Sequence, residues 1–132
     1  MKLLLDTHAL LWACMEPRKL GAQARAAIND PASEVFVSAI SFWEISLKYA
    51  LGKLDLQGVT PDALPAVAEE SGFNVLRLEP EHAASFHQLT RTSHKDPFDR
   101  MLVWQAIGAG LILISKEKFP AEYLKLGLRV VW

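Results

Sequence analysis

The sequence predicts an α/β fold, a three-layer α/β/α sandwich around a parallel sheet. Short apolar segments alternate along the chain with segments of helical periodicity, which is the order of elements in such a fold. Two apolar segments, 3–5 and 111–114, contain only leucine and isoleucine, as in strands buried on both faces. Repeats, low-complexity tracts and linkers are absent, so the 132 residues are expected to form one domain, 1–132.

The elements expected in the first half of the chain follow from these patterns. In order they are a strand at 2–5, helices at 8–15 and 21–30, a strand at 34–38 and helices at 38–51 and 61–71. Pro17 ends the first helix, and Gly52 lies just past the end of the third as a C-cap.

The second half continues the alternation of strands and helices. The expected elements are a strand at 73–78, helices at 81–89 and 97–109, a strand at 111–115, a short helical turn at 119–126 and a strand at 128–132. In a parallel sheet the site lies at the carboxyl ends of the strands, where the strand order reverses. Asp6 directly follows the first strand and is therefore well placed for that crevice.

The stretch 94–106 carries two carboxylates, Asp96 and Asp99, on either side of Pro97. Proline is favoured in the first turn of a helix, so Asp96 is expected to be the N-cap and Pro97 the first helical residue. A purely structural interpretation is strong here: Asp96 caps the helix, and Asp99 folds back toward the cap as in a capping box. What favours a functional role is the presence of other acids elsewhere in the chain.

Asp6 and Glu44 are the two other acids of interest. Asp6 follows three leucines, where a charge is costly unless it has a partner or a role, although an N-cap role for the next helix is an equal alternative. Glu44 has apolar neighbours in the sequence and is expected on or near the buried face of its helix. Its structural alternatives are an i,i+4 pair with Lys48 or a capping interaction with Ser41.

Four carboxylates that converge on one site repel one another and need a cation. Oxygen ligands without clustered His or Cys favour Mg²⁺ or Mn²⁺ over zinc. Such an ion, which keeps several of its waters, suits phosphate chemistry. The acidic residues expected at this metal and catalytic site are Asp6, Glu44, Asp96 and Asp99.

Composition limits the binding partners and the cellular compartment that can be expected for this chain. The formal net charge of −1 leaves no electrostatic signature of tight, non-specific nucleic-acid binding, although local charge matters more than the sum. Cys14 is alone, so we expect a reducing cytoplasm and no internal disulfide. Asp6 and His8 interrupt the apolar start, which argues against a secretion signal, and no segment is long enough to span a membrane.

Three motifs in this order and spacing resemble the PIN-domain ribonucleases, and most closely the VapC-type toxins of bacterial toxin–antitoxin pairs. The motifs are Leu4-Leu5-Asp6-Thr7-His8, Ser38-Ala39-Ile40-Ser41-Phe42-Trp43-Glu44-Ile45 and Asp96-Pro97-Phe98-Asp99-Arg100. The resemblance covers essentially the whole chain.

The resemblance implies a metal-dependent endoribonuclease that cleaves structured RNA, of the transfer RNA or ribosomal RNA class. Asp6, Glu44 and Asp99 match the metal-binding acids of the family, and Asp96 is a further acid of this subgroup. The implied fold is a parallel five-stranded α/β/α sandwich. The implied partners are a second copy of the chain and a cognate antitoxin whose tail covers the site.

One position departs from the family pattern, which often has a further aspartate just after the fourth strand. Here the run is Ser115-Lys116-Glu117, with lysine at that position. Asp96 could supply the missing oxygen, Glu117 could substitute, or a second metal site is weak or absent; we favour Asp96 with one well-held metal. Lys116 could contact the scissile phosphate, and Ser115 could add a hydroxyl.

Several neighbours are accessory candidates: Thr7 and His8 beside Asp6, His94 before the third motif, and Arg100 and Lys48 as local positive charge. The alternative function is a catalytically degenerate domain that retains only protein or RNA binding, which Lys116 keeps open. An aspartyl-phosphate phosphatase is disfavoured because its usual second aspartate, two residues after Asp6, is His8 here. A dinucleotide enzyme is excluded by the missing glycine-rich fingerprint.

Overall fold

The computed structural model describes residues 1–132 and contains a five-stranded, wholly parallel sheet with the strand order β3-β2-β1-β4-β5. Its strands are β1 (Lys2–Leu5), β2 (Glu34–Ser38), β3 (Asn74–Leu76), β4 (Ile112–Ile114) and β5 (Arg129–Val131). The sequence-based prediction of a parallel five-stranded α/β fold is confirmed.

Seven α-helices connect the strands. They are α1 (Thr7–Met15), α2 (Ala22–Asn29), α3 (Ala39–Ala50), α4 (Leu64–Glu70), α5 (Pro80–Ser85), α6 (Pro97–Ala109) and α7 (Ala121–Lys125). Three short 3₁₀ turns accompany them, at Pro17–Lys19, Pro61–Ala63 and Phe86–Gln88. None of the helices is both long and apolar enough to cross a membrane.

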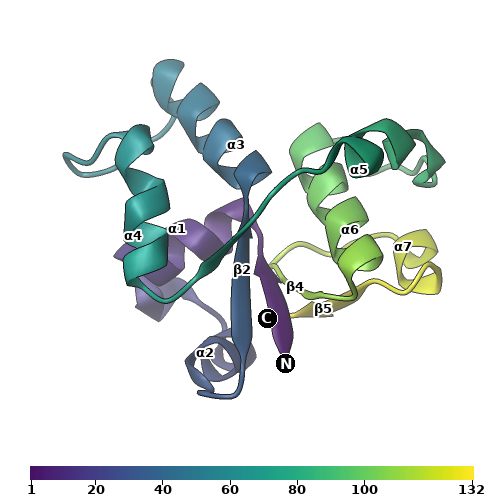
Figure 1. The fold of residues 1–132 in the computed structure, drawn as a ribbon, viewed down its shortest axis with the longest axis horizontal. Coiled ribbons are helices and arrows are strands. Elements are labelled where there is room, and N and C mark those ends of the chain that lie inside the picture. Colours follow the sequence, from purple (N-terminus) through teal and green to yellow (C-terminus); the bar gives the residue numbers. More distant parts are fainter.

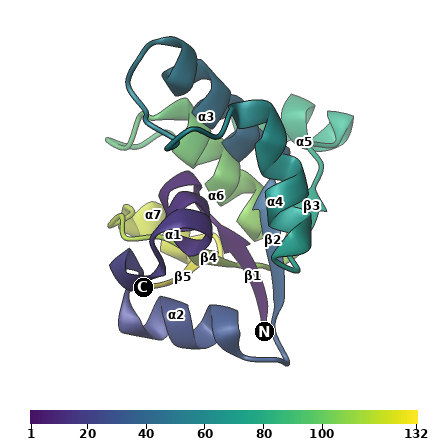
Figure 2. The same cartoon turned by 90° about the vertical axis from the view of Figure 1, so that its left-hand side faces the viewer.

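Successive leucines of β1 face opposite layers, because side chains alternate across a strand. Leu3 and Leu5 belong to the core that is shared with α1, α2 and α4, whereas Leu4 belongs to the core that is shared with α6 and α7. All three are fully buried. Figure 1 shows the two groups of helices on opposite sides of the sheet, and Figure 2 shows α1 and α2 from the side they cover.

The strand order reverses between β1 and β4, so the loops that leave these two strands diverge at the same edge of the sheet. The backbone continues the sheet pairing there: the Asp6 amide donates to the Ile114 carbonyl at 3.0 Å, and the Ser115 amide donates to the Val131 carbonyl at 3.2 Å. Asp6 and Ser115 therefore lie at the carboxyl edge, as predicted for Asp6.

The elements differ from expectation mainly at their ends. β3 is three residues long rather than the six of 73–78, and it lies at the edge of the sheet, with one neighbour strand. The segments predicted as helices 61–71 and 81–89 are each divided between a 3₁₀ turn and a shorter α-helix. Pro61 begins the first of these segments and Pro80, which begins α5, precedes the second, while the last turn of 81–89 has 3₁₀ hydrogen bonding.

A buried tyrosine anchors the loop that leads into α6. The Tyr123 hydroxyl, on α7, accepts hydrogen bonds from Arg100 Nε at 3.2 Å and from the Thr92 hydroxyl at 3.1 Å. Arg100 also donates to the carbonyls of Leu89 and Thr90 at 3.2 and 3.4 Å. Because Arg100 is in the first turns of α6, this network sets the position of the helix start relative to the loop.

We expect Tyr123→Phe to destabilise the protein by about 1–3 kcal/mol, because Arg100 and Thr92 each lose a buried acceptor while the volume hardly changes. Urea unfolding followed by circular dichroism measures the change. The matched control is Tyr49→Phe, whose side chain is 40% exposed, and its effect is expected to stay within about 0.5 kcal/mol. Equal stabilities for the two variants would contradict the role given to Tyr123.

Candidate metal centre

Three carboxylates approach the carboxyl edge of the sheet from three different elements. Asp6 ends β1, Glu44 is in α3, which follows β2, and Asp99 is in the first turn of α6. The charge of Asp99 raises the pKa of Asp6, and the charge of Glu44 raises the pKa of Asp99. The hydroxyl of Thr7, the residue after Asp6, also bonds to Glu44. The three acids, which are far apart along the chain, therefore lie in one region at the carboxyl edge of the sheet.

Asp6 is a buried carboxylate that also caps a helix. Its side chain is 4% exposed, and its Oδ1 accepts from the Ala9 amide at 2.8 Å. This confirms the N-cap role and adds the favourable field of the α1 N-terminus. Even so, burial raises the pKa of Asp6 from 3.8 to about 6, while bonds from Ser115 and Ala9 act in the opposite direction.

Glu44 is buried in the second turn of α3, with 3% exposure, as its apolar neighbours in the sequence predicted. Its Oε1 accepts a 2.5 Å hydrogen bond from the Thr7 hydroxyl, and the hydroxyl oxygens of Thr7 and Ser41 are 3.2 Å apart. Its Oε2 forms an ion pair with Lys48, one helical turn further along. The i,i+4 pair considered from the sequence is thus present, whereas Ser38, and not Ser41, caps this helix.

Asp96 and Asp99 have different environments at the start of α6. Asp96 is exposed and caps the helix, accepting from the Asp99 amide at 3.0 Å. The Asp99 carboxylate is partly buried and bonds to His94 Nε2 at 2.9 Å. The expected capping box is therefore only half formed: the Asp99 side chain turns toward His94 and away from the cap amide.

Repulsion among the acids adds to the effect of burial. Burial is the main cause of the raised pKa of Asp99, and the neighbouring carboxylates Asp96 and Glu44 raise it further. The hydrogen bond from His94 acts in the opposite direction. Two of the three central carboxylates are thus harder to ionise than usual, which is the expected state of a charge cluster that a cation would stabilise.

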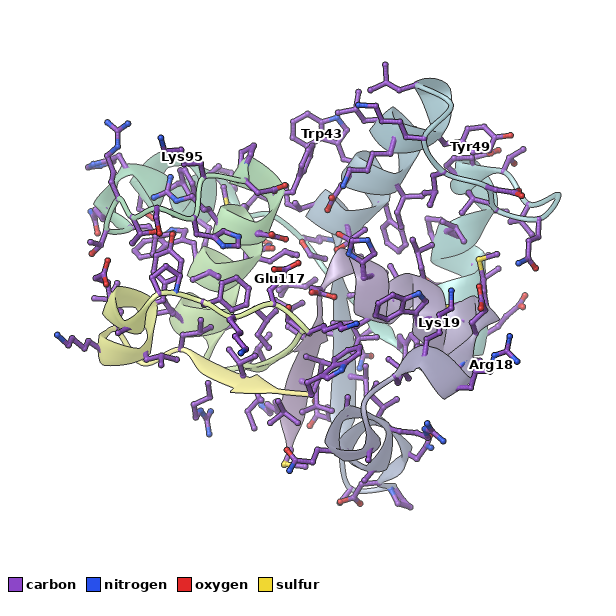
Figure 3. All side chains as sticks on the ribbon, turned by 180° about the vertical axis from the view of Figure 1, so that it is seen from behind. Arg18, Lys19, Trp43, Tyr49, Lys95 and Glu117 are labelled. Atoms are coloured by element: carbon purple, nitrogen blue, oxygen red, sulfur yellow. The ribbon has the colours of Figure 1, made fainter.

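The residues after β4 contribute to the same edge. Ser115 is buried, lowers the pKa of Asp6, and accepts from the Glu117 amide at 3.0 Å. Lys116 and Glu117 are exposed, and Glu117 lies between α6 and the start of α1 in Figure 3. Both residues therefore follow the buried Ser115 at the carboxyl edge of the sheet and face solvent.

The accessory candidates His8 and Arg100 contact different parts of the protein. His8 is exposed in the first turn of α1, with its ring centroid 5.5 Å from that of Trp12. Arg100 directs its guanidinium to Tyr123 and to the loop carbonyls, so the structure gives it an anchoring role and does not bring it to the acids.

His94 and Thr7 contact site carboxylates in ways that the sequence did not indicate. The sequence marked His94 only as an accessory candidate before the third motif, and the structure bonds it to Asp99, with its ring centroid 5.1 Å from that of Phe119. Thr7 is 37 residues from Glu44, so no local spacing rule could join them. The only available signal was the position of Thr7 beside Asp6 at the end of the first strand.

The donor set fits a hard divalent cation, because every candidate ligand is a carboxylate oxygen. As the side chains stand, no three His, Cys, Asp or Glu residues converge closely enough to hold an ion. Glu44 pairs with Lys48, and Asp99 pairs with His94. An ion shared by the three carboxylates would require the Glu44 and Asp99 oxygens to move toward Asp6, which is held at the helix cap.

The sequence matches a known family over most of its length. The family model described as the PIN domain matches residues 3–120. A curated relative, ribonuclease VapC22 of Mycobacterium tuberculosis, is 30% identical over 115 residues, which are 87% of this chain and 86% of the relative.

Solved structures show the same fold. A chain of the VapBC2 complex of Rickettsia felis, bound to a promoter DNA fragment, superposes with a TM-score of 0.61 over 99% of this chain and 98% of that chain, at 11% identity. A chain of FitAB bound to the IR36 DNA fragment gives 0.61 at 19% identity, over 99% and 94%. A chain of FitAcB from Neisseria gonorrhoeae gives 0.60 at 21% identity, over 98% and 96%.

The raised pKa of Asp6 predicts how stability depends on pH without metal. The folded state holds the proton more tightly than the unfolded chain, so the destabilisation is absent below pH 3.8, grows as the pH rises, and is complete above about 6. Asp6→Asn keeps an N-cap and removes the charge. In EDTA at pH 8 we expect the variant to be more stable than the wild type by up to roughly 3 kcal/mol.

Thermal unfolding of both proteins between pH 4 and 8 measures this difference, which should shrink toward pH 4. The control is Glu122→Gln, an exposed acid on α7, expected to follow the wild type at every pH. Parallel wild-type and Asp6→Asn curves across this range would show that burial of Asp6 carries no such cost.

Proposed function

This chain belongs to the PIN-domain family, and from that premise we propose that it is a metal-dependent endoribonuclease that hydrolyses phosphodiester bonds in RNA. One observation carries the proposal: a buried aspartate at the end of β1 shares an electrostatic cluster with Glu44 and Asp99 from two other elements. Buried carboxylates rarely gather without a role, because each raises the cost of ionising the others. The name of the curated relative, a ribonuclease, supports the same activity.

Asp6, Glu44 and Asp99 would hold Mg²⁺ or Mn²⁺, with Asp96 as a further acid at the rim. When bound, such an ion supplies an activated water and neutralises the charge that builds on the phosphate oxygens. The protein groups around the acids prepare this site. The Asp6 carboxylate is held by the Ala9 amide, and Thr7 holds one oxygen of Glu44.

The polar groups around the acids would position the RNA. Lys116 and His8 are exposed beside the acidic residues and could contact phosphate oxygens, while Ser115 is buried and orients Asp6. The formal charge of −1 gives the chain little general attraction to nucleic acid. Recognition must then depend on local groups and on RNA shape, which suits a structured substrate of the transfer RNA or ribosomal RNA class.

We expect the purified chain, free of any partner, to cleave structured RNA with Mg²⁺ or Mn²⁺ and not in EDTA. Asp6→Asn should reduce the rate by roughly 100-fold or more, the scale of losing a group that stabilises transition-state charge. Gel analysis of labelled total RNA measures the rates. The control is Asp62→Asn, a fully exposed acid outside the cluster, expected to cleave like the wild type.

Absence of cleavage by a folded wild-type protein under both metals would favour the alternative function, a degenerate domain that only binds protein or RNA. Lys116, at the position where the family often has an acid, is the residue that supports this alternative. Cleavage that survives both EDTA and Asp6→Asn would instead place the active site elsewhere.

We propose a cognate antitoxin and a second copy of the chain as protein partners, in the cytoplasm that the lone Cys14 suggests. The similar solved structures come from complexes named VapBC2 and FitAB, which supports a protein partner. Trp43 and Leu47 of α3 and Leu51, just past its end, support the homodimer: these side chains follow one another at helical spacing and are 61, 41 and 60% exposed. Figure 3 shows Trp43 on the side of α3 that faces α6, where its ring also packs edge-on against Phe98 with the centroids 5.2 Å apart.

If this face forms the dimer, Leu47→Glu should shift the protein toward monomer by placing a charge in an apolar contact. Sedimentation velocity at several concentrations measures the distribution. Leu124→Glu, at a leucine on α7 that is 52% exposed, is the control and should remain dimeric. A wild-type protein that stays monomeric at high concentration would overturn the homodimer proposal.

A further inference from the structure

Lys48 is the lysine that forms an ion pair within the acidic cluster. Its ammonium bonds to Glu44 Oε2, while the Lys19–Glu16 ion pair lies on the surface away from the site. Lys48 also attracts Asp96 and Asp99 electrostatically, so it acts on the acids of α6 as well as on its own helix. Its side chain is only 37% exposed, beside a carboxylate that is 4% exposed.

The two oxygens of Glu44 are each held by one group, Oε1 by Thr7 and Oε2 by Lys48. An ionised carboxylate offers about four lone-pair positions. Glu44 can therefore keep both partners and still bind a metal ion. The geometry does not force Lys48 to leave when an ion arrives.

A count of formal charges shows what this lysine changes. Asp6, Glu44 and Asp99 contribute −3, and Lys48 contributes +1, which leaves −2 with His94 counted as neutral. The exposed Asp96 and Lys116 carry opposite charges and cancel. One divalent cation balances the remaining charge, and a second would leave an excess of two positive charges before any phosphate is bound.

We propose that Lys48 is a positioning residue that supplies the second positive charge of the site, so that each chain binds a single divalent cation. It holds Glu44 in place, and its positive charge replaces the charge that a second metal ion would otherwise supply. This inference rests on the proposed nuclease function, and it names the metal stoichiometry of that same site.

Mn²⁺ binding measured by calorimetry, with free Mn²⁺ followed by electron paramagnetic resonance, tests the proposal. The proteins are the wild type, Lys48→Gln, Lys48→Arg and the matched control Lys19→Gln. We expect one Mn²⁺ per chain for the wild type, Lys48→Arg and Lys19→Gln. For Lys48→Gln, which keeps a hydrogen-bond donor and loses the charge, we expect a second Mn²⁺ per chain.

RNA cleavage gives a second readout that a merely structural role would not produce. At a Mn²⁺ concentration that fills one site, Lys48→Gln should cleave about 10-fold more slowly than the wild type, the usual scale for a group that supports a metal ligand. Further Mn²⁺ should restore much of this rate for Lys48→Gln and have no such effect on Lys19→Gln.

Two Mn²⁺ per wild-type chain would overturn the inference and leave the nuclease proposal intact. So would unchanged stoichiometry and affinity in Lys48→Gln, because the ion pair would then serve only the helix. If Lys48→Gln does not fold, the wild-type stoichiometry and the Lys48→Arg variant decide. If the wild type binds no more Mn²⁺ than Asp6→Asn does, the proposed function itself fails.

Discussion

A charge at the end of a strand buried on both faces is the constraint on which the site depends. β1 is the middle strand of the sheet, and its three leucines fill the cores on both sides, so the carboxylate of Asp6 cannot retreat to bulk water. An isolated buried carboxylate is costly. The Ala9 amide and Ser115 offset part of this cost, and the pKa of Asp6 nevertheless stays raised, to about 6.

The other acids are each stabilised by a partner from a different part of the fold. Glu44 is held across the gap between two helices by Thr7 and along its own helix by Lys48. Asp99 is held by His94 from the preceding loop. These partners allow the protein to fold with a cluster of like charges. They also orient the carboxylate oxygens. The same groups therefore stabilise the acids in the folded protein and position them to bind a cation.

Neighbouring charged residues can have unrelated roles, as Asp99 and Arg100 show. Asp99 bonds to His94 at the acidic cluster. Arg100, one position further along α6, bonds to Tyr123 and anchors the loop that carries His94. Sequence inspection assigned both to the site because they share a motif. A step of one residue rotates the side chain by about 100° around a helix, which is enough to move it from the site to the scaffold.

The type and order of the elements, the place of Asp6 after β1, and the capping roles of Asp6 and Asp96 could be predicted from the amino-acid sequence. These features obey local rules of periodicity, apolar runs and helix caps, which act over a few residues. The hydrogen bond from Thr7 to Glu44 and the pairing of Asp99 with His94 could be found only in the folded structure. Such contacts depend on strand order and on loop path, which bring distant residues together and which no local pattern encodes.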